Sequence, residues 1–304
     1  MSPVTRRRVL QGAGAFGVAT LGLGSYAFGV EPGLMLGVTS YNVTPPRWPD
    51  ALSLKIAVIA DLHACEPWMS QARVRGICEL ANSLAPDITV LLGDFNGGHN
   101  FVTAPVLPEQ WGEAISVLRA RLGVFAVLGN HDWWHGALPK MRGDEAEGAR
   151  RALRHARVKL LENDGVRLGE GANAFWLLGL GDQIAYRVRR GQYNGADDLD
   201  GTMRKLTDEA PAILLAHEPY VFNRVPDRVS LTLCGHTHGG QVNLPLVGAP
   251  FARNRFGKNH VYGHVVEGGR HMIISAGLGT SIAPVRFGRP PEVVLVTLGT
   301  SALA

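Results

Sequence analysis

The chain has 304 residues, of which 46% are hydrophobic and 18% are charged, and this composition is typical of a globular protein and not of a disordered one. The formal net charge of +4 owes three positive charges to the N-terminal arginines Arg6, Arg7 and Arg8, so we expect no nucleic-acid partner. Three cysteines without a Cys-x-x-Cys spacing exclude a disulfide framework.

Residues 1–30 have the pattern of an export leader. The segment Thr5–Gln11 contains twin arginines, and a weakly hydrophobic stretch rich in Gly and Ala follows it up to Val30. This pattern predicts export by the twin-arginine machinery, with the protein in the periplasm or at the cytoplasmic membrane. A weak cleavage site at Ala27–Gly29 and an uncharged run long enough to span a bilayer leave two alternatives, a cleaved signal and a membrane anchor.

The next part of the chain predicts an edge strand and then three β-α units. Residues 31–53 read as a linker with a strand at 38–43 that pairs with the sheet of the main domain, which we place at 54–300. Continuous apolar runs predict buried strands, and apolar positions three and four apart predict helices between them. The predicted strands are 55–60, 88–92 and 124–128, and the predicted helices are 70–84 and 108–122.

The second half of the chain predicts a second, more antiparallel sheet. An amphipathic helix is expected at 142–156, and the strand-like segments are 159–161, 175–179, 212–216, 229–233, 272–275 and 292–298. The polar stretch 183–200 is predicted to be a solvent-exposed loop, with a cap over the substrate as the alternative.

Polar side chains follow several of these strands at the point where each strand ends. They are Asp61 and His63, Asp94, Asn130 and His131, His217, and His236 and His238. The carboxyl ends of strands in an open α/β sheet share one edge, where ligands bind. Carboxylates, imidazoles and an amide oxygen at this edge predict a site for two ions of Mn, Fe or Zn. Because side chains alternate along a strand, His236 and His238 are expected to point the same way.

The series Asp-x-His, Gly-Asp, Gly-Asn-His-Asp, His and Gly-His-x-His resembles the calcineurin-like metallophosphoesterase superfamily over residues 54–298. The resemblance implies a four-layer α-β-β-α sandwich of two mixed sheets that hydrolyses phosphoesters with a hydroxide bridging two metal ions. One ion would be held by Asp61, His63, Asp94 and His238, and the other by Asp94, Asn130, His217 and His236. His131 would face the scissile phosphate, with Asp132 as its orienting partner.

The leader and the segment from Gly277 to Glu292 narrow the resemblance to an exported or membrane-associated bacterial branch of phosphodiesterases. Its substrates would be phosphate esters, including lipid-linked ones, and membrane association is expected with them. The alternatives are a UDP-2,3-diacylglucosamine pyrophosphatase of lipid A biosynthesis and an inactive scaffold. Arg286 or Arg289 would clamp a second phosphate, or else form a structural pair with Glu292.

The remaining cysteine, tryptophan and histidine residues of interest are predicted to have structural roles and no catalytic ones. Cys65 is predicted to be a packing residue, and Trp133 and Trp134 are predicted to pack in the core, with the wall of the pocket as the alternative. The histidines without a partner motif are expected on the surface or in loops; they are His99, His135, His260, His264 and His271.

Overall fold

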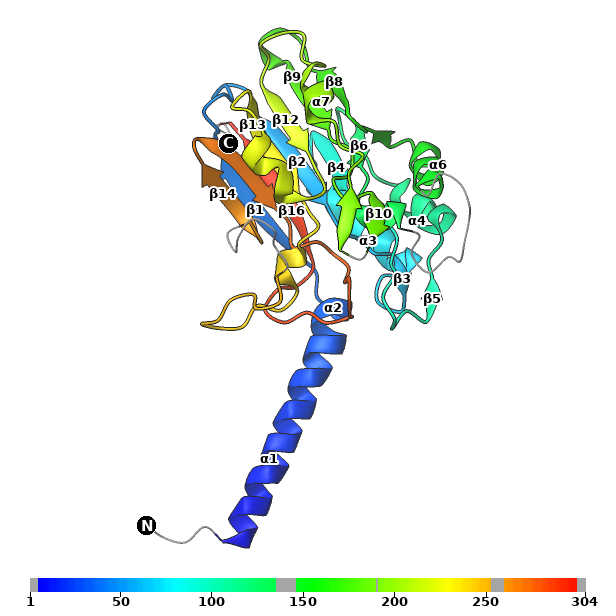
Figure 1. Cartoon of the computed structure of the whole chain (residues 1–304), viewed down its shortest axis with the longest axis vertical. Helices are drawn as coiled ribbons and strands as arrows, with labels where there is room; N and C mark the ends of the chain where they lie inside the picture. The colour runs from blue at the N-terminus through cyan, green and yellow to red at the C-terminus, as the bar shows by residue number, and fades with distance from the viewer. Residues whose placement is uncertain (1–4, 135–145, 190, 253–259, 300–304) are drawn as a thin grey trace.

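The computed structural model describes residues 5–134, 146–189, 191–252 and 260–299 (Figure 1). Its first sheet has six strands in the order β1-β16-β2-β4-β6-β7. These strands are β1 (Gly37–Val43), β16 (Glu292–Leu298), β2 (Leu54–Ile59), β4 (Ile88–Leu92), β6 (Val124–Val127) and β7 (Lys159–Leu160). Only the β16–β2 pair is antiparallel. The predicted edge strand therefore exists, and it pairs with β16 along its full length.

The second sheet also has six strands, in the order β14-β15-β13-β12-β9-β8. They are β14 (Gly263–Glu267), β15 (Arg270–Ile274), β13 (Val229–Cys234), β12 (Ala212–Leu215), β9 (Phe175–Gly179) and β8 (Asp164–Leu168). The two edge pairs are antiparallel and the four central strands are parallel. The second sheet is thus more antiparallel than the first, as predicted, although its four central strands are parallel. The segments 159–161 and 292–298, expected in this sheet, instead contribute β7 and β16 to the first sheet.

The two sheets pack face to face with helices outside them, which confirms the predicted fold class. The helices α3 (Gln71–Ser83), α4 (Pro108–Ile115) and α6 (Glu147–His155) cover the first sheet. A second apolar core, containing Ile56, Val90 and Leu231, lies between the sheets. The short helices α7 (Leu199–Met203) and η3 (Pro219–Arg224) contribute to a third core on the far face of the second sheet. That outer layer is therefore thinner than the layer of α3, α4 and α6.

Helix boundaries are the main difference from the expected elements. Helix α4 ends at Ile115, seven residues before its predicted end, because residues 116–122 form turns and loops. Helix α6 begins at Glu147, and residues 142–145 of the predicted helix lie outside the described residues. The predicted loop at 183–200 contains a hairpin of β10 (Tyr186–Arg189) and β11 (Gln192–Asn194). A further short pair joins β3 (Cys65–Glu66) to β5 (Ala104–Pro105).

The N-terminal segment forms the helix α1 (Arg6–Ser25), which projects away from the body of the molecule (Figure 1). It continues through η1 (Tyr26–Val30) and α2 (Glu31–Leu34) into β1. Contrary to the expectation that residues 1–30 lie outside the fold, Ala27 O accepts a hydrogen bond from Arg286 N at 2.9 Å, and Phe28 O accepts one from Trp68. Among the described residues, we find no helix with both the length and the apolar character needed to cross a membrane.

Candidate metal centre

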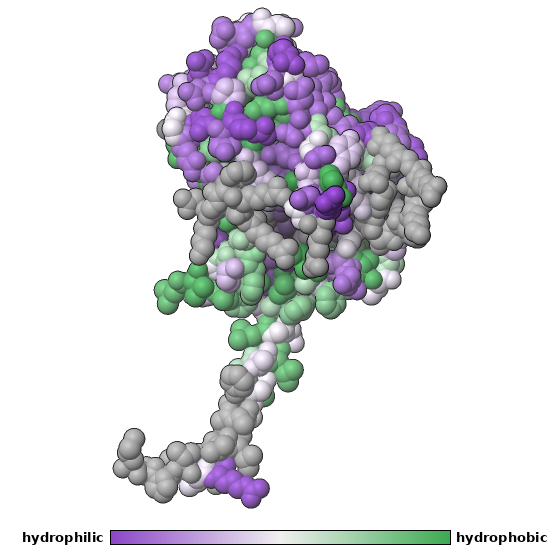
Figure 2. All heavy atoms as spheres, viewed as in Figure 1, coloured by the Kyte–Doolittle hydropathy of each residue, from purple (hydrophilic) through white to green (hydrophobic). Residues whose placement is uncertain are grey.

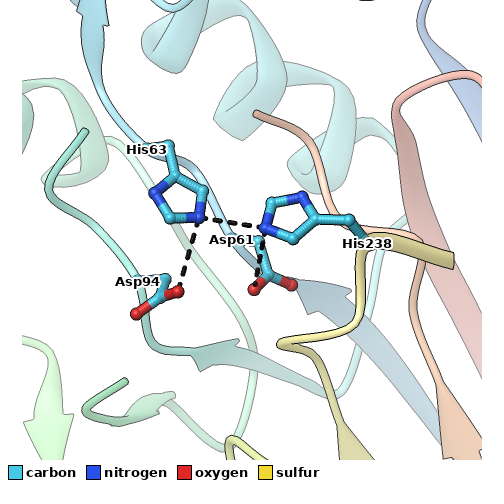
Figure 3. Close-up of side chains that lie close together, drawn as sticks. All are labelled: Asp61, His63, Asp94 and His238. Carbon is cyan, nitrogen blue, oxygen red and sulfur yellow. Dashed lines mark hydrogen bonds and ion pairs between the residues drawn. The ribbon is translucent and has the colours of Figure 1, made fainter. Parts of the chain in front are cut away.

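Four buried side chains that follow three different strands converge on one point (Figure 3). His63 Nε2 lies 3.4 Å from Asp94 Oδ2 and 3.0 Å from His238 Nε2. His238 Nε2 also lies 3.8 Å from Asp61 Oδ1. Asp61 and His63 follow β2, Asp94 follows β4 and His238 follows β13, so the sheets themselves bring these groups together. The set is the one that the sequence predicted for the first metal ion.

A second group of side chains shares Asp94 with the first. His217 Nε2 lies 3.3 Å from Asp94 Oδ2, and the ligand atoms of Asp94, His217 and His236 lie close enough to hold one ion. Asn130 Oδ1 is 2.9 Å from His236 Nδ1, which brings the predicted amide ligand into the same group. Asp94 therefore lies between two sets of candidate ligands, as a bridging carboxylate would.

Five of the candidate ligands adopt left-handed backbone conformations. The φ values are 53° for Asp61, 44° for His63, 54° for Asp94, 69° for His236 and 52° for His238. Such values are uncommon outside glycine, although Asp and His tolerate them better than most residues, and they cluster at functional sites.

This geometry corrects our expectation for His236 and His238. Strand β13 ends at Cys234, and both histidines lie in the turn that follows, so side-chain alternation along a strand does not align them. The turn instead directs His238 to the first group of ligands and His236 to the second.

Burial and charge pairing together set the protonation of the candidate ligands. Burial raises the pKa of Asp61 to about 7 and lowers the pKa of His63 to about 3. The His63 imidazole is therefore neutral and can donate an electron pair to a metal ion. Burial also opposes the charged forms of Asp94 and His217, but their mutual attraction prevails. It holds the pKa of Asp94 well below, and that of His217 well above, the ordinary values.

The hydrogen bonds of the site leave ligand atoms available for metal ions. His217 Nδ1 donates to Leu92 O at 2.6 Å, and His63 Nδ1 donates to Asn96 O at 3.2 Å, so both Nε2 atoms point at Asp94. Within the described part of the chain, Asp61 Oδ2 and His217 Nε2 are buried without a hydrogen-bond partner. Buried polar atoms normally have a partner, and a metal ion is one that fits these atoms.

Asp132 binds the backbone of the loop that carries Asp94. Its carboxylate accepts hydrogen bonds from the backbone N–H groups of Asp94 and Gly129 at 2.9 and 3.0 Å, and from that of Phe95 at 2.9 Å. Among the described hydrogen bonds, none joins Asp132 to the His131 ring, which it was predicted to orient. Asp132 instead holds the loop that carries the bridging carboxylate, because the buried N–H groups of that loop need an acceptor.

His131 lies at the rim of the two groups of ligands. Its backbone N–H donates to Asp94 Oδ1 at 2.7 Å, and its ring centroid is 4.7 Å from that of His63. Among the described residues, its ring nitrogens form no hydrogen bond, and the residue is half-buried. The ring is thus free to contact a bound substrate.

The two tryptophans after His131 have separate roles. Trp133 is buried in the core beside the first sheet, as predicted. Trp134 is half-buried, and its ring lies 5.5 Å from that of His131. Trp134 therefore packs at the edge of the same core and also contacts His131.

The two arginines near the C-terminus lie behind the first group of ligands. Arg286 is fully buried, and its guanidinium donates to Gly279 O at 2.6 Å and to Ala276 O at 2.9 Å, with His238 Nδ1 3.4 Å away. Among the described ion pairs there is none between Arg286 and Glu292. The alternative of a structural arginine was therefore right about the kind of role and wrong about the partner. The side chain of Arg289 stacks on the ring of Tyr262.

Several residues near the site gave no usable signal in the sequence. Tyr220 lies with its hydroxyl 3.0 Å from His236 Nε2. Asp182 and Glu218 are buried next to His217 and form a third group that could hold a cation. His99, expected on the surface or in a loop, lies in a loop but is buried, with its ring 5.4 Å from that of Trp68. His135 lies outside the described residues, whereas Cys65 is buried as predicted.

The fold and the candidate ligands around Asp94 define a class of protein, the two-sheet metal-dependent hydrolases. The model of the calcineurin-like phosphoesterase family matches residues 54–240, and the chain belongs to this family. The protein is accordingly a metal-dependent phosphoesterase, and the family binds divalent metals.

Curated relatives resemble nearly the whole chain. An uncharacterized metallophosphoesterase of Bacillus subtilis, YkuE, is 28% identical over 98% of this chain and 99% of its own length. Phosphodiesterase YaeI of Escherichia coli is 29% identical over 97% of this chain and 99% of its own. An uncharacterized metallophosphoesterase of Aquifex aeolicus is 30% identical over 86% of this chain and 92% of its own.

Gly129 offers a test of the packing around the bridging carboxylate. A Cβ atom at this position would lie 2.5 Å from Asp94 Oδ1 and 2.6 Å from His217 Cε1, distances that require both ligands to move. We expect Gly129→Ala to destabilise the protein by about 1–3 kcal/mol and to lower its metal content. Urea unfolding and metal analysis measure the two effects.

The matched control is Gly76→Ala in the exposed face of α3, where an added Cβ meets nothing within 4 Å. This change should stabilise the protein by about 0.5–1 kcal/mol, because alanine favours a helix over glycine. Normal metal content and stability in Gly129→Ala would contradict the geometry described for Asp94 and His217.

Proposed function

We propose that the protein hydrolyses phosphodiester or pyrophosphate bonds at this dinuclear centre. The observation that carries the proposal is the position of Asp94, which lies 3.4 Å from His63 and 3.3 Å from His217 and so joins two sets of ligands. The phosphodiesterase named among the relatives supports the choice of a diester.

Each part of the site has a chemical role in this proposal. Two metal ions bound here would lower the pKa of a water molecule and neutralise charge on the phosphoryl oxygens. Asp61, His63, Asn130, His217, His236 and His238 would hold the ions around Asp94. The half-buried ring of His131 would stabilise charge at the phosphate or protonate the leaving oxygen. Arg286, buried behind His238, would position that ligand.

A substrate panel tests the proposal directly. The purified protein, with its metal content measured, is assayed with bis-p-nitrophenyl phosphate, p-nitrophenyl phosphate and a nucleotide-sugar pyrophosphate. We expect faster hydrolysis of the diester or the pyrophosphate than of the monoester. Two bound metals without hydrolysis of any of the three would overturn the proposal and favour the inactive scaffold.

We further propose that the twin-arginine leader takes the protein to the outer face of the cytoplasmic membrane, where it acts on phosphate esters that include lipid-linked ones. Apolar residues gather at the end of the body from which α1 projects (Figure 2). Large exposed apolar side chains in α2 and in the loops next to it include Leu34, Leu246, Phe251 and Ile282, each at least 70% exposed. Exposed apolar patches of this kind are common at membrane-contacting surfaces.

The location is tested in spheroplasts. An exported domain should be degraded by added protease and should pellet with the membranes. Serine at Leu246, Phe251 and Ile282 should shift much of it to the soluble fraction, whereas Val266→Ser on β14 should not. Protection from protease would place the domain inside the cell and favour the UDP-2,3-diacylglucosamine pyrophosphatase, whose nucleotide substrate is cytoplasmic.

A further inference from the structure

One side of the metal centre is bordered by the β10–β11 hairpin. Trp134 anchors this hairpin, because its indole N–H lies 3.2 and 3.1 Å from the carbonyl oxygens of Ile184 and Ala185 just before β10. The ring of Trp134 also stacks on that of Tyr193 in β11, with 5.3 Å between centroids. The same indole touches His131. The hairpin is therefore fixed next to the residue expected to face the phosphate.

Arg187 is the charged group of the hairpin that lies on the Trp134 ring. It lies opposite Tyr193 in the hairpin, and its guanidinium carbon is 3.7 Å from the centroid of the Trp134 ring. Stacking on an aromatic ring fixes the plane of a guanidinium and leaves the N–H groups at its edges available.

The charge of Arg187 is not neutralised by the surrounding protein. Across the described portion of the chain, its side chain forms no ion pair or hydrogen bond, and the residue is exposed. Other exposed arginines do have such partners: Arg224 pairs with Asp197 at 3.0 Å, and Arg167 pairs with Asp208 at 2.7 Å.

We propose that Arg187, held on Trp134, forms a binding site for a second negatively charged group of the substrate, on the leaving-group side of the scissile phosphate. This proposal rests on the proposed function, since it specifies which phosphoesters the same centre prefers. A planar guanidinium with free N–H edges binds phosphate or carboxylate through paired hydrogen bonds. The favoured substrates are those whose leaving group carries its own phosphate or carboxylate, such as pyrophosphates.

The test compares two substrates in the metal-loaded full-length protein. Bis-p-nitrophenyl phosphate has a leaving group without a second anion, whereas a nucleotide-sugar pyrophosphate releases a phosphate-bearing group. We expect Arg187→Gln to raise KM for the pyrophosphate by about ten- to a hundredfold, the range for one hydrogen bond to a charged group. KM for the diester should change less than about threefold, and Arg187→Lys should retain part of the preference.

Arg189→Gln is the matched control, because Arg189 lies on the same hairpin beyond an irregularity in its pairing and is also exposed. It should leave both KM values unchanged. Equal loss on both substrates in Arg187→Gln would overturn the proposal, since the hairpin would then only shape the site.

The outcome can be separated from that of the proposed function. If the wild-type protein hydrolyses neither substrate, the proposed function fails, and binding of inorganic pyrophosphate to the metal-loaded protein then decides the role of Arg187. Weaker binding by Arg187→Gln than by Arg189→Gln would support the anion site. Equal binding by the two variants would overturn it.

Discussion

Replacing His131 by alanine should reduce turnover by about a hundredfold or more while leaving the metal content near that of the wild-type protein. The ring lies beside the ligand His63, but His131 contacts Asp94 through its backbone N–H, which alanine retains. The side chain is therefore available for the substrate and not required to hold the ions. General acid catalysis typically contributes about a hundred- to ten-thousandfold.

Steady-state kinetics and elemental analysis of the same preparation measure both quantities. His264→Ala is a suitable control, because His264 lies on β14 and pairs with His271 at an exposed position. That variant should keep both activity and metals. If His131→Ala loses the metals together with its activity, His131 acts as a ligand and its proposed role is wrong.

The variants His236→Ala and His238→Ala should each lack about one metal ion, and the missing ion should differ between the two. His238 belongs with Asp61, His63 and Asp94, whereas His236 belongs with Asp94 and His217. Each change removes one ligand from one group, while the shared carboxylate and the ligands of the other group remain. Activity should fall strongly in both variants, since the proposed chemistry needs both ions.

Loading each variant with a spectroscopically active ion such as Mn²⁺ distinguishes the two outcomes. The wild-type protein should show coupling between two ions, and each variant should show the signal of an isolated ion in a distinct environment. Loss of both ions from either variant would mean that the two histidines serve one common site. The Gly76→Ala protein provides a substitution that is distant from the centre for comparison.

Much of the fold could be predicted from the sequence because its strands are nearly uniform in hydrophobicity. Residues 88–92, 175–179 and 292–298 form the strands β4, β9 and β16 with the predicted bounds. Strands buried on both faces need continuous apolar runs, which are easy to recognise. Helix ends were harder to predict, because the amphipathic pattern continues beyond Ile115, where α4 ends.

The polar residues at the strand ends were also evident from the sequence, since strand ends of an α/β sheet meet at one edge. The division of the candidate ligands into two groups around Asp94 followed from the family resemblance, and the structure brings those same residues together. Their roles in catalysis stay predictions until they are measured.

Tertiary structure alone decided how these side chains are oriented and which contacts fix them in place. The left-handed turns at Asp61, Asp94 and His236 depend on the contacts around them, which no local pattern records. Asp132 binds the backbone of a loop 38 residues away in the sequence, and Arg187 reaches Trp134 across more than 50 residues. The chain by itself specified which groups meet at the edge of the sheets. Long-range packing decided which of them face the ions, which hold the loops and which remain free for a substrate.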